Sequence, residues 1–153
     1  MRAIISLVIT MFILFGCGNG HIGEKQQGGG NNAESDQDIV VDKMVSSITE
    51  ISPLQYEYKV KNQTQETITL EFTSSQRVDY SVSTKEGQEL FLYSSTASFL
   101  AALGEETIAP GEEFQYKINL TELNLQKGEY ILTVWMTPEE GASFKITKEF
   151  TLE

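Results

Sequence analysis

The stretch Leu54-Gln55-Tyr56-Glu57-Tyr58-Lys59-Val60-Lys61 alternates large apolar or aromatic side chains with polar ones over its whole length. Successive side chains of a β-strand point to opposite faces of the sheet, so one face of this stretch is apolar and the other polar. The pattern therefore predicts a strand that buries one face in a core and leaves the other in water.

The same alternation recurs in four other stretches of the chain. Residues 44–51 predict a weaker first strand, and only residues 96–103 have helical character, which predicts a single turn crossing between sheets. The apolar positions of the four stretches are Ile68, Leu70 and Phe72; Val78, Tyr80 and Val82; Phe114, Tyr116 and Ile118; and Phe144, Ile146, Phe150 and Leu152.

The breaks between these runs carry turn residues. Residues 62–66, 85–87 and 138–141 are short enough for hairpins, and Pro110-Gly111 predicts a type II turn. Turn signals recur about every ten residues without long helical stretches between them, which is typical of an antiparallel sandwich. The predicted fold class is therefore all-β, with two antiparallel sheets packed face to face.

Residues 129–137 differ from the other predicted strands, because both faces are apolar. Tyr130, Leu132, Val134 and Met136 form one face, and Ile131, Thr133 and Trp135 the other. Such a strand is either central and covered on both sides, or it exposes an aromatic residue for binding. We expect a covered, central strand.

Residues 1–17 predict a lipoprotein signal. Arg2 supplies a positive charge, residues 3–15 are apolar apart from Ser6 and Thr10, and Gly16 precedes Cys17, the only cysteine. This order suits a secretory signal peptide, and its end resembles a bacterial lipobox. The resemblance implies cleavage between Gly16 and Cys17 and a diacylglyceryl group on the Cys17 sulfur. The alternative is an ordinary secreted protein with a free thiol.

The domain organisation follows from this signal. Residues 1–16 are the predicted signal peptide, and residues 17–37, rich in glycine and asparagine, are a predicted flexible linker that begins at the lipid-bearing cysteine. Residues 38–153 then form one β-sandwich domain. Two acyl chains suffice to hold a protein on a membrane, so we expect a lipid-anchored protein on the extracytoplasmic face of the bacterial cell membrane.

Composition argues against several classes of function. The chain has 11 basic and 22 acidic residues and a formal net charge of −11, so its surface repels nucleic-acid phosphates. The only histidine, His21, and Cys17 both precede the domain, which leaves no imidazole or thiol there for nucleophilic catalysis or for zinc. The acid pairs at 105–106, 112–113 and 139–140 read as solvated turn charges. We expect neither an enzyme nor a cofactor or metal.

Residues 72–80, Phe-Thr-Ser-Ser-Gln-Arg-Val-Asp-Tyr, predict a structural corner. Gln76 shares the inward face of Val78, so its amide needs partners, and backbone groups at a change of strand are the expected ones. Arg77 and Asp79 are expected to form an exposed pair on the outer face.

This corner also resembles a known family. The run FTSSQRVDYSV at 72–82, with Gly87-Gln88-Glu89, Ala109-Pro110-Gly111-Glu112 and Gly128-Glu129-Tyr130, is similar to the intracellular proteinase inhibitor (BsuPI-like) domains. The resemblance spans roughly residues 56–136. It implies an immunoglobulin-like sandwich and inhibition of a subtilisin-like serine protease.

Residues 94–111 are the longest segment without a predicted strand, and an inhibitor docks through such a loop. Phe99, Leu100 and Leu103 are the candidate protease contacts, because their apolar side chains suit a specificity pocket. They either fill that pocket or plug the open end of the sandwich, and the plug is the expected arrangement.

Two functions stay open at this point. The first is a lipoprotein that inhibits a serine protease by protein–protein contact. The second is a non-inhibitory, immunoglobulin-like binding or scaffold module of the cell envelope that recognises an envelope protein, a glycan or a spore-coat partner. The oligomeric state is left open by the sequence, since the order of the strands and the pairing of their edges are not known.

Overall fold

The computed structural model describes residues 43–153, which lie within one compact unit. Strands make up most of it, with the short helix α1 (Tyr93–Thr96) and the 3-10 turn η1 (Thr121–Leu123) between them. The strands are β1 (Met44–Ser52), β2 (Gln55–Asn62), β3 (Ile68–Phe72), β4 (Val78–Thr84), β5 (Glu89–Leu92), β6 (Gly104–Ile108), β7 (Glu113–Asn119), β8 (Gly128–Met136) and β9 (Ser143–Leu152).

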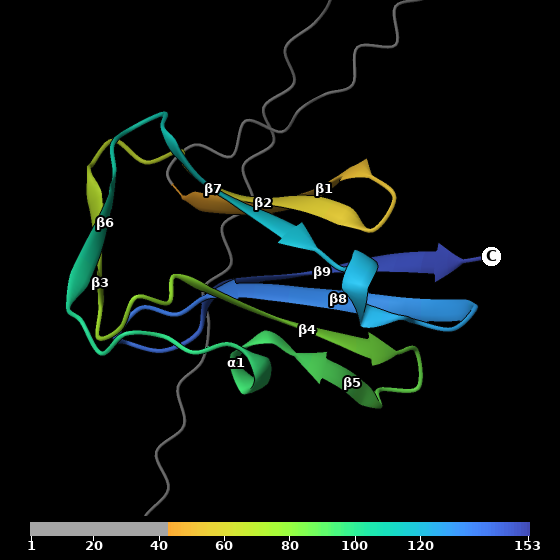
Figure 1. Cartoon of the computed structure of the whole chain (residues 1–153). Helices are drawn as coiled ribbons and strands as arrows, with labels where there is room; N and C mark the ends of the chain where they lie inside the picture. Colours follow the sequence, from red (N-terminus) through yellow and green to blue (C-terminus); the bar gives the residue numbers. More distant parts are fainter. Residues whose placement is uncertain (1–42) are drawn as a thin grey trace, which may run out of the picture. The chain divides into compact units, whose positions relative to one another are not determined.

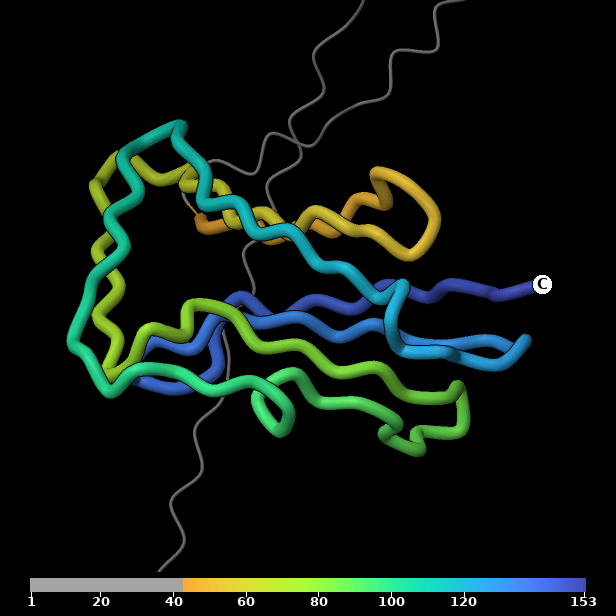
Figure 2. Tube along the Cα trace, in the orientation of Figure 1, coloured from red at the N-terminus to blue at the C-terminus, as the bar shows by residue number. Residues whose placement is uncertain are grey.

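Two antiparallel sheets face each other as layers (Figure 1). One has the strand order β1-β2-β7 and the other β5-β4-β8-β9. A separate two-stranded ribbon, β3-β6, runs across one end of both layers, as the chain trace shows (Figure 2). The all-β antiparallel sandwich expected from the sequence is confirmed, and the ribbon is an addition to it.

The core lies between the two layers and is built by the predicted alternation. Tyr56, Tyr58 and Val60 of β2 are fully buried, and Leu132 and Val134 of β8 are fully buried in the opposite sheet. Burying an apolar side chain of this size stabilises the fold by about 1.5–3 kcal/mol. The strand predicted at residues 54–61 is therefore confirmed, and it provides the centre of the core.

Two of the predicted hairpins and the type II turn are also confirmed. Residues 85–87 join the paired strands β4 and β5, and residues 138–141 join β8 and β9. At Pro110-Gly111 the Glu112 N–H donates to the Ala109 carbonyl at 3.0 Å, and Gly111 has a φ of 81°. Positive φ at this position is the conformation that a type II turn requires and that glycine adopts readily.

The hairpin predicted at residues 62–66 is wrong, because β2 pairs with β1 and β7 and not with β3. Asn62 is fully buried and redirects the chain from the sheet to the ribbon. Its Oδ1 accepts bonds from the Thr64 N–H and hydroxyl, while its Nδ2 donates to the Glu66 and Ile108 carbonyls, both at 2.8 Å. An asparagine that satisfies four groups in this way makes a tight turn that leaves the sheet.

The helical turn expected at residues 96–103 is also wrong. The helix lies earlier, at Tyr93–Thr96, and Ala97 is already extended, with a ψ of 155°. The Ser95 and Thr96 hydroxyls bond back to the Leu92 and Tyr93 carbonyls, an alternative to continued helix. The segment at 94–111 is thus not one irregular loop, since it contains α1, a loop at 97–103 and strand β6.

Strand β8 is central, as predicted, with β4 on one side and β9 on the other. Its second face, however, is half-buried rather than covered. Trp135 lies on that face, and the Lys145 ammonium is 5.1 Å from the centre of a Trp135 ring. The long Lys145 side chain therefore packs over the Trp135 indole and covers part of it.

Replacing Asn62 with alanine removes both side-chain donors and the side-chain acceptor from a fully buried position. We expect the Asn62→Ala change to lower the free energy of unfolding by about 3 kcal/mol, because buried carbonyls lose their partners. Asn119 is the matched control, since its Oδ1 likewise accepts from the N–H and hydroxyl of Thr121, but at an exposed site. Urea unfolding should show a loss below about 1 kcal/mol for Asn119→Ala. Equal losses would contradict the role given to Asn62.

Alkaline pH should destabilise the domain, because its core contains buried tyrosines. Burial raises the pKa of both Tyr56 and Tyr80 from 10.0 to about 12. The folded state therefore holds these phenols neutral, and the unfolded state loses their protons first. The associated stability is fully present below pH 10 and is lost as the pH rises toward 12. Denaturant unfolding between pH 8 and pH 12 measures this decline, which should be smaller for Tyr56→Phe.

Candidate functional site

The corner between β3 and β4, residues 73–77, organises one end of the domain. Gln76 lies half-buried there, and its Nε2 donates to the Val78 carbonyl at 3.2 Å, which confirms the predicted bond to backbone. The Thr137 hydroxyl donates to the Gln76 carbonyl, and the Thr137 N–H donates to the Arg77 carbonyl. The corner is thereby tied to the end of β8.

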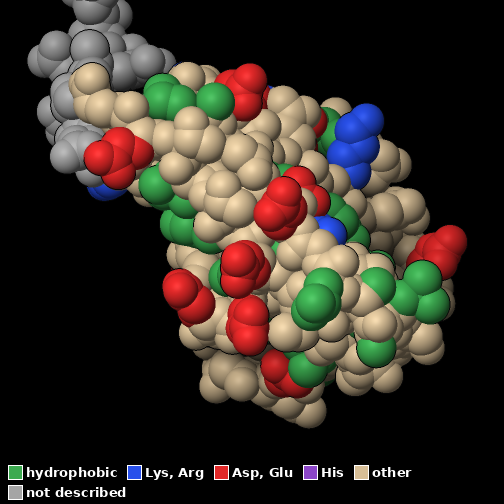
Figure 3. Space-filling view, turned by 90° about the vertical axis from the view of Figure 1, so that its left-hand side faces the viewer, with side chains coloured by type: hydrophobic (Ala, Val, Ile, Leu, Met, Phe, Trp, Pro, Cys, Tyr) green, Lys and Arg blue, Asp and Glu red, His purple; other side chains and the backbone are tan. Residues whose placement is uncertain are grey.

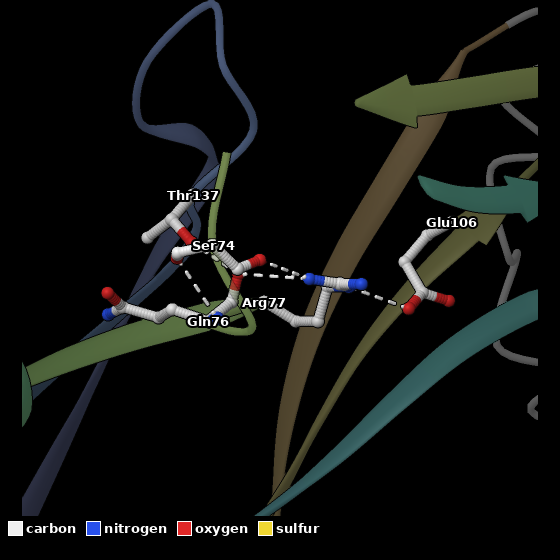
Figure 4. A network of polar contacts seen from close by, with 5 residues as sticks. All are labelled: Ser74, Gln76, Arg77, Glu106 and Thr137. Carbon is white, nitrogen blue, oxygen red and sulfur yellow. Dashed lines mark hydrogen bonds and ion pairs between the residues drawn. The ribbon is translucent and has the colours of Figure 1, made fainter. Parts of the chain in front are cut away.

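Arg77 points from this corner toward the β3-β6 ribbon (Figure 4). Its Nε donates to Glu106 Oε1 at 2.8 Å and its Nη1 donates to the Ser74 carbonyl at 2.8 Å. The guanidinium carbon is 4.5 Å from the centre of the Phe72 ring. A Cβ at Gly104 would collide with the guanidinium, so any larger residue at that position would force Arg77 to shift from its present place.

The predicted exposed pair between Arg77 and Asp79 is wrong. Asp79 is only 7% exposed, and its Oδ1 accepts the N–H groups of Tyr80 and Ser94, at 2.9 and 3.0 Å. A buried carboxylate needs such donors, because an unpaired charge in the interior is costly. Asp79 therefore fixes the start of the segment that follows β5.

Ser75 holds the loop at 97–103 by two bonds to one residue. The Ser75 N–H donates to the Leu100 carbonyl, and the Leu100 N–H donates to the Ser75 hydroxyl, both at 2.9 Å. The Ala102 N–H also donates to the Leu100 carbonyl, at 3.0 Å. These three bonds, which we call the Leu100 clamp, fix the backbone in the middle of the loop.

Phe99 anchors the same loop to the core. Its ring meets Tyr93 edge-on with centroids 5.6 Å apart, and Tyr93 stacks on Tyr80 at 4.7 Å. Burial and a hydrogen bond to Tyr93 raise the pKa of Tyr116, and burial raises the pKa of Tyr80 to about 12. These phenols therefore stay protonated at neutral pH and serve to pack the loop, since none can act as a base.

The three predicted contact residues differ in their exposure to solvent. Phe99 is half-buried, whereas Leu100 is 74% and Leu103 87% exposed. The two leucines therefore do not plug the open end of the sandwich, and only Phe99 packs inward. Both leucines thus present apolar side chains to solvent on a loop whose backbone is held by hydrogen bonds.

Two hollows lie along the ribbon, and one of them borders Leu103. One of about 350 Å³ is lined by Leu103, Phe72, Gly104 and three glutamates, Glu71, Glu105 and Glu139. A second, of about 580 Å³, shares Glu71 and Glu139 with it and adds Glu140. Acidic side chains gather around scattered apolar ones on this end of the molecule (Figure 3). Within β3-β6, Glu71 and Glu105 pair directly across the strands, an unfavourable arrangement of like charges.

Several sequence predictions fall outside this site. Gly16 and Cys17, with the predicted signal peptide at 1–16 and linker at 17–37, lie outside the described residues. Among residues 43–153 there is no group of histidine, cysteine, aspartate or glutamate placed to hold a metal ion. In the same part of the chain no helix is long and apolar enough to cross a membrane.

Sequence reasoning missed the residues that position the loop. Ser75 and Leu100 are 25 residues apart, and Arg77 and Glu106 are 29 apart. Nothing in either local pattern predicts these pairings. A signal was present only for Glu106, which occupies an inward position once β6 is recognised as a strand. The acid pair at 105–106 was assigned to a solvated turn, and that assignment is wrong for Glu106.

Comparison with known proteins gives one family. No curated protein matches the chain significantly. A crystal structure of a protein from Archaeoglobus fulgidus has a TM-score of 0.30 at 13% identity, covering 74% of this chain and 98% of that chain, a likeness too weak for any argument. The model of the family "Intracellular proteinase inhibitor" (BsuPI) matches residues 39–141, which is well over half of the chain. The sequence motif, the corner that it builds and this match agree, and the chain belongs to the BsuPI family of intracellular proteinase inhibitors.

Proposed function

We propose that this chain inhibits a subtilisin-like serine protease by direct contact through the loop at residues 97–103. The observation that carries this proposal is the Leu100 clamp, which holds the loop backbone while Leu100 and Leu103 remain 74% and 87% exposed. A protease recognises short extended segments and fills its specificity pocket with one side chain. A loop with two exposed leucines offers such a segment.

Preorganisation is what distinguishes an inhibitor loop from a flexible substrate. Ordering a loop during binding costs affinity, and each immobilised side chain adds about 0.5–1.5 kcal/mol to that cost. Here Ser75 holds the middle of the loop, Phe99 packs on Tyr93, and β6 begins at Gly104. Most of the ordering cost is thus met when the domain folds, before any protease binds.

We also propose that the inhibitor acts outside the cytoplasm, held by a lipid on Cys17. The support is the sequence, in which an apolar run ends at Gly16 and the only cysteine follows. The target would then be a secreted or wall-associated protease. An envelope protein that is not a protease is the alternative partner, and the same exposed loop could serve it.

Titration into subtilisin-like proteases tests the inhibitory contact. With a soluble chain that begins at Gly18, we expect residual activity to fall in proportion to inhibitor and to reach zero near equal molar amounts. Replacing both Leu100 and Leu103 with alanine should weaken inhibition about 100-fold, because truncating two anchors costs about 2–4 kcal/mol.

The matched control replaces Ile51 and Leu90 with alanine, since these side chains are 49% and 45% exposed and lie on other elements. This control should inhibit like the wild type. Full protease activity at large molar excess of the wild-type chain would refute the inhibitor proposal. The next step would then be to search for a partner among other envelope proteins.

A Cys17→Ser variant tests the anchor. In bacterial cells the wild-type chain should fractionate with membranes and take up radiolabelled palmitate, whereas Cys17→Ser should do neither, because it lacks the thiol that carries the lipid. Membrane association that survives the substitution, or a wild-type chain without label, would be incompatible with lipidation at this residue.

A further inference from the structure

A serine protease reads the backbone of the residue whose side chain fills its primary pocket. The carbonyl oxygen of that residue must enter the oxyanion hole, where enzyme N–H groups donate to it. A segment docked as an added strand also needs free main-chain groups to pair with the enzyme. The exposed side chain of a pocket-filling residue must therefore come with an available carbonyl.

Leu100 fails this requirement although it is exposed. Its carbonyl oxygen already accepts bonds from the N–H groups of Ser75 and Ala102, at 2.9 and 3.0 Å. A carbonyl oxygen has two lone pairs, and both are in use. The Leu100 N–H is also taken, by the Ser75 hydroxyl at 2.9 Å. Leu100 could enter an oxyanion hole only by breaking the clamp that makes the loop rigid.

Leu103 meets the requirement. Within the described residues, no turn or loop hydrogen bond involves the Leu103 N–H or carbonyl. Its side chain is 87% exposed, the largest fraction among the exposed large hydrophobic residues. The two residues before it, Ala101 and Ala102, are exposed and small, so an enzyme surface can approach closely.

The segment at residues 101–103, which we call the tip, is fixed at both ends. On one side stands the Leu100 clamp, and on the other Gly104 pairs with Phe72 in the ribbon, with Arg77 packed against it. The tip is thus a tripeptide that joins two segments of fixed backbone.

We infer that Leu103 is the residue that enters the primary pocket of the target protease, with Leu100 serving as part of the support. This inference rests on the proposed inhibitory function. If Leu103 fills the primary pocket, the target protease has a deep apolar pocket that accepts leucine. Because Glu71, Glu105 and Glu139 line the hollow beside Leu103, the rim of that pocket is neutral or basic, and an acidic rim would be repelled.

The test is an exchange of specificity with a matched pair of variants. Leu103→Lys and Leu100→Lys place the same cation at two exposed positions of the same loop, and both are prepared in the soluble chain that begins at Gly18. Each is titrated against a subtilisin-like protease inhibited by the wild type and against trypsin, whose pocket carries an aspartate that binds lysine. Circular dichroism and thermal melting confirm that both variants are folded.

We expect Leu103→Lys to lose at least 100-fold in affinity for the subtilisin-like protease and to become an inhibitor of trypsin. Leu100→Lys should lose less affinity for the subtilisin-like protease than Leu103→Lys does and should leave trypsin active, because that side chain contacts the enzyme outside the primary pocket.

The reverse result, in which Leu100→Lys gains trypsin inhibition, would overturn the inference, as would equal losses for both variants without any effect on trypsin. In either case the wild type would still be an inhibitor. A wild-type chain that inhibits none of the proteases removes the proposed function itself and this inference with it.

Discussion

The guanidinium of Arg77 is the group on which this end of the molecule depends. It lies over the Phe72 ring, reaches the Glu106 carboxylate and the Ser74 carbonyl, and packs closely against Gly104. A partly buried cation is tolerated only when its donors are satisfied, and here the partners come from two strands and the corner between β3 and β4. One side chain thus holds the ribbon against the corner, and the corner in turn presents Ser75 to the loop.

Local patterns in the sequence predicted the strands and turns whose formation depends on residues close together in the chain. The period of two at Tyr56, Tyr58 and Val60 identified the buried strand β2, and Pro110-Gly111 identified the turn before β7, because each signal depends on only a few neighbouring positions. Strand β6 was missed since its inward position is filled by Glu106, a charge that looks solvated until Arg77 is placed beside it. Asp79 was put on the surface for the same reason, as its partner Ser94 lies 15 residues further along.

The same difference between local patterns and contacts of distant residues applies to the candidate site. Its exposed leucines were named from the sequence, but whether they face solvent or the core was decided by contacts between distant segments. Ser75, which holds Leu100, belongs to the corner motif and lies 25 residues before that leucine, whereas Tyr93, which packs on Phe99, begins α1. Alternation along a strand says which side chains share a face, and it does not say which backbone groups of a loop are already bonded.

The groups that hold the loop at residues 97–103 differ from the side chains that the loop exposes. The contacts that hold the loop use the Leu100 main chain, the Ser75 N–H and hydroxyl, and the Phe99 ring, and the side chains of residues 101–103 contribute to none of them. Those three positions can accept new residues without disturbing the packed interior. Substitutions at these positions can therefore change the exposed surface of the loop, while the contacts that stabilise the fold lie in other parts of the domain.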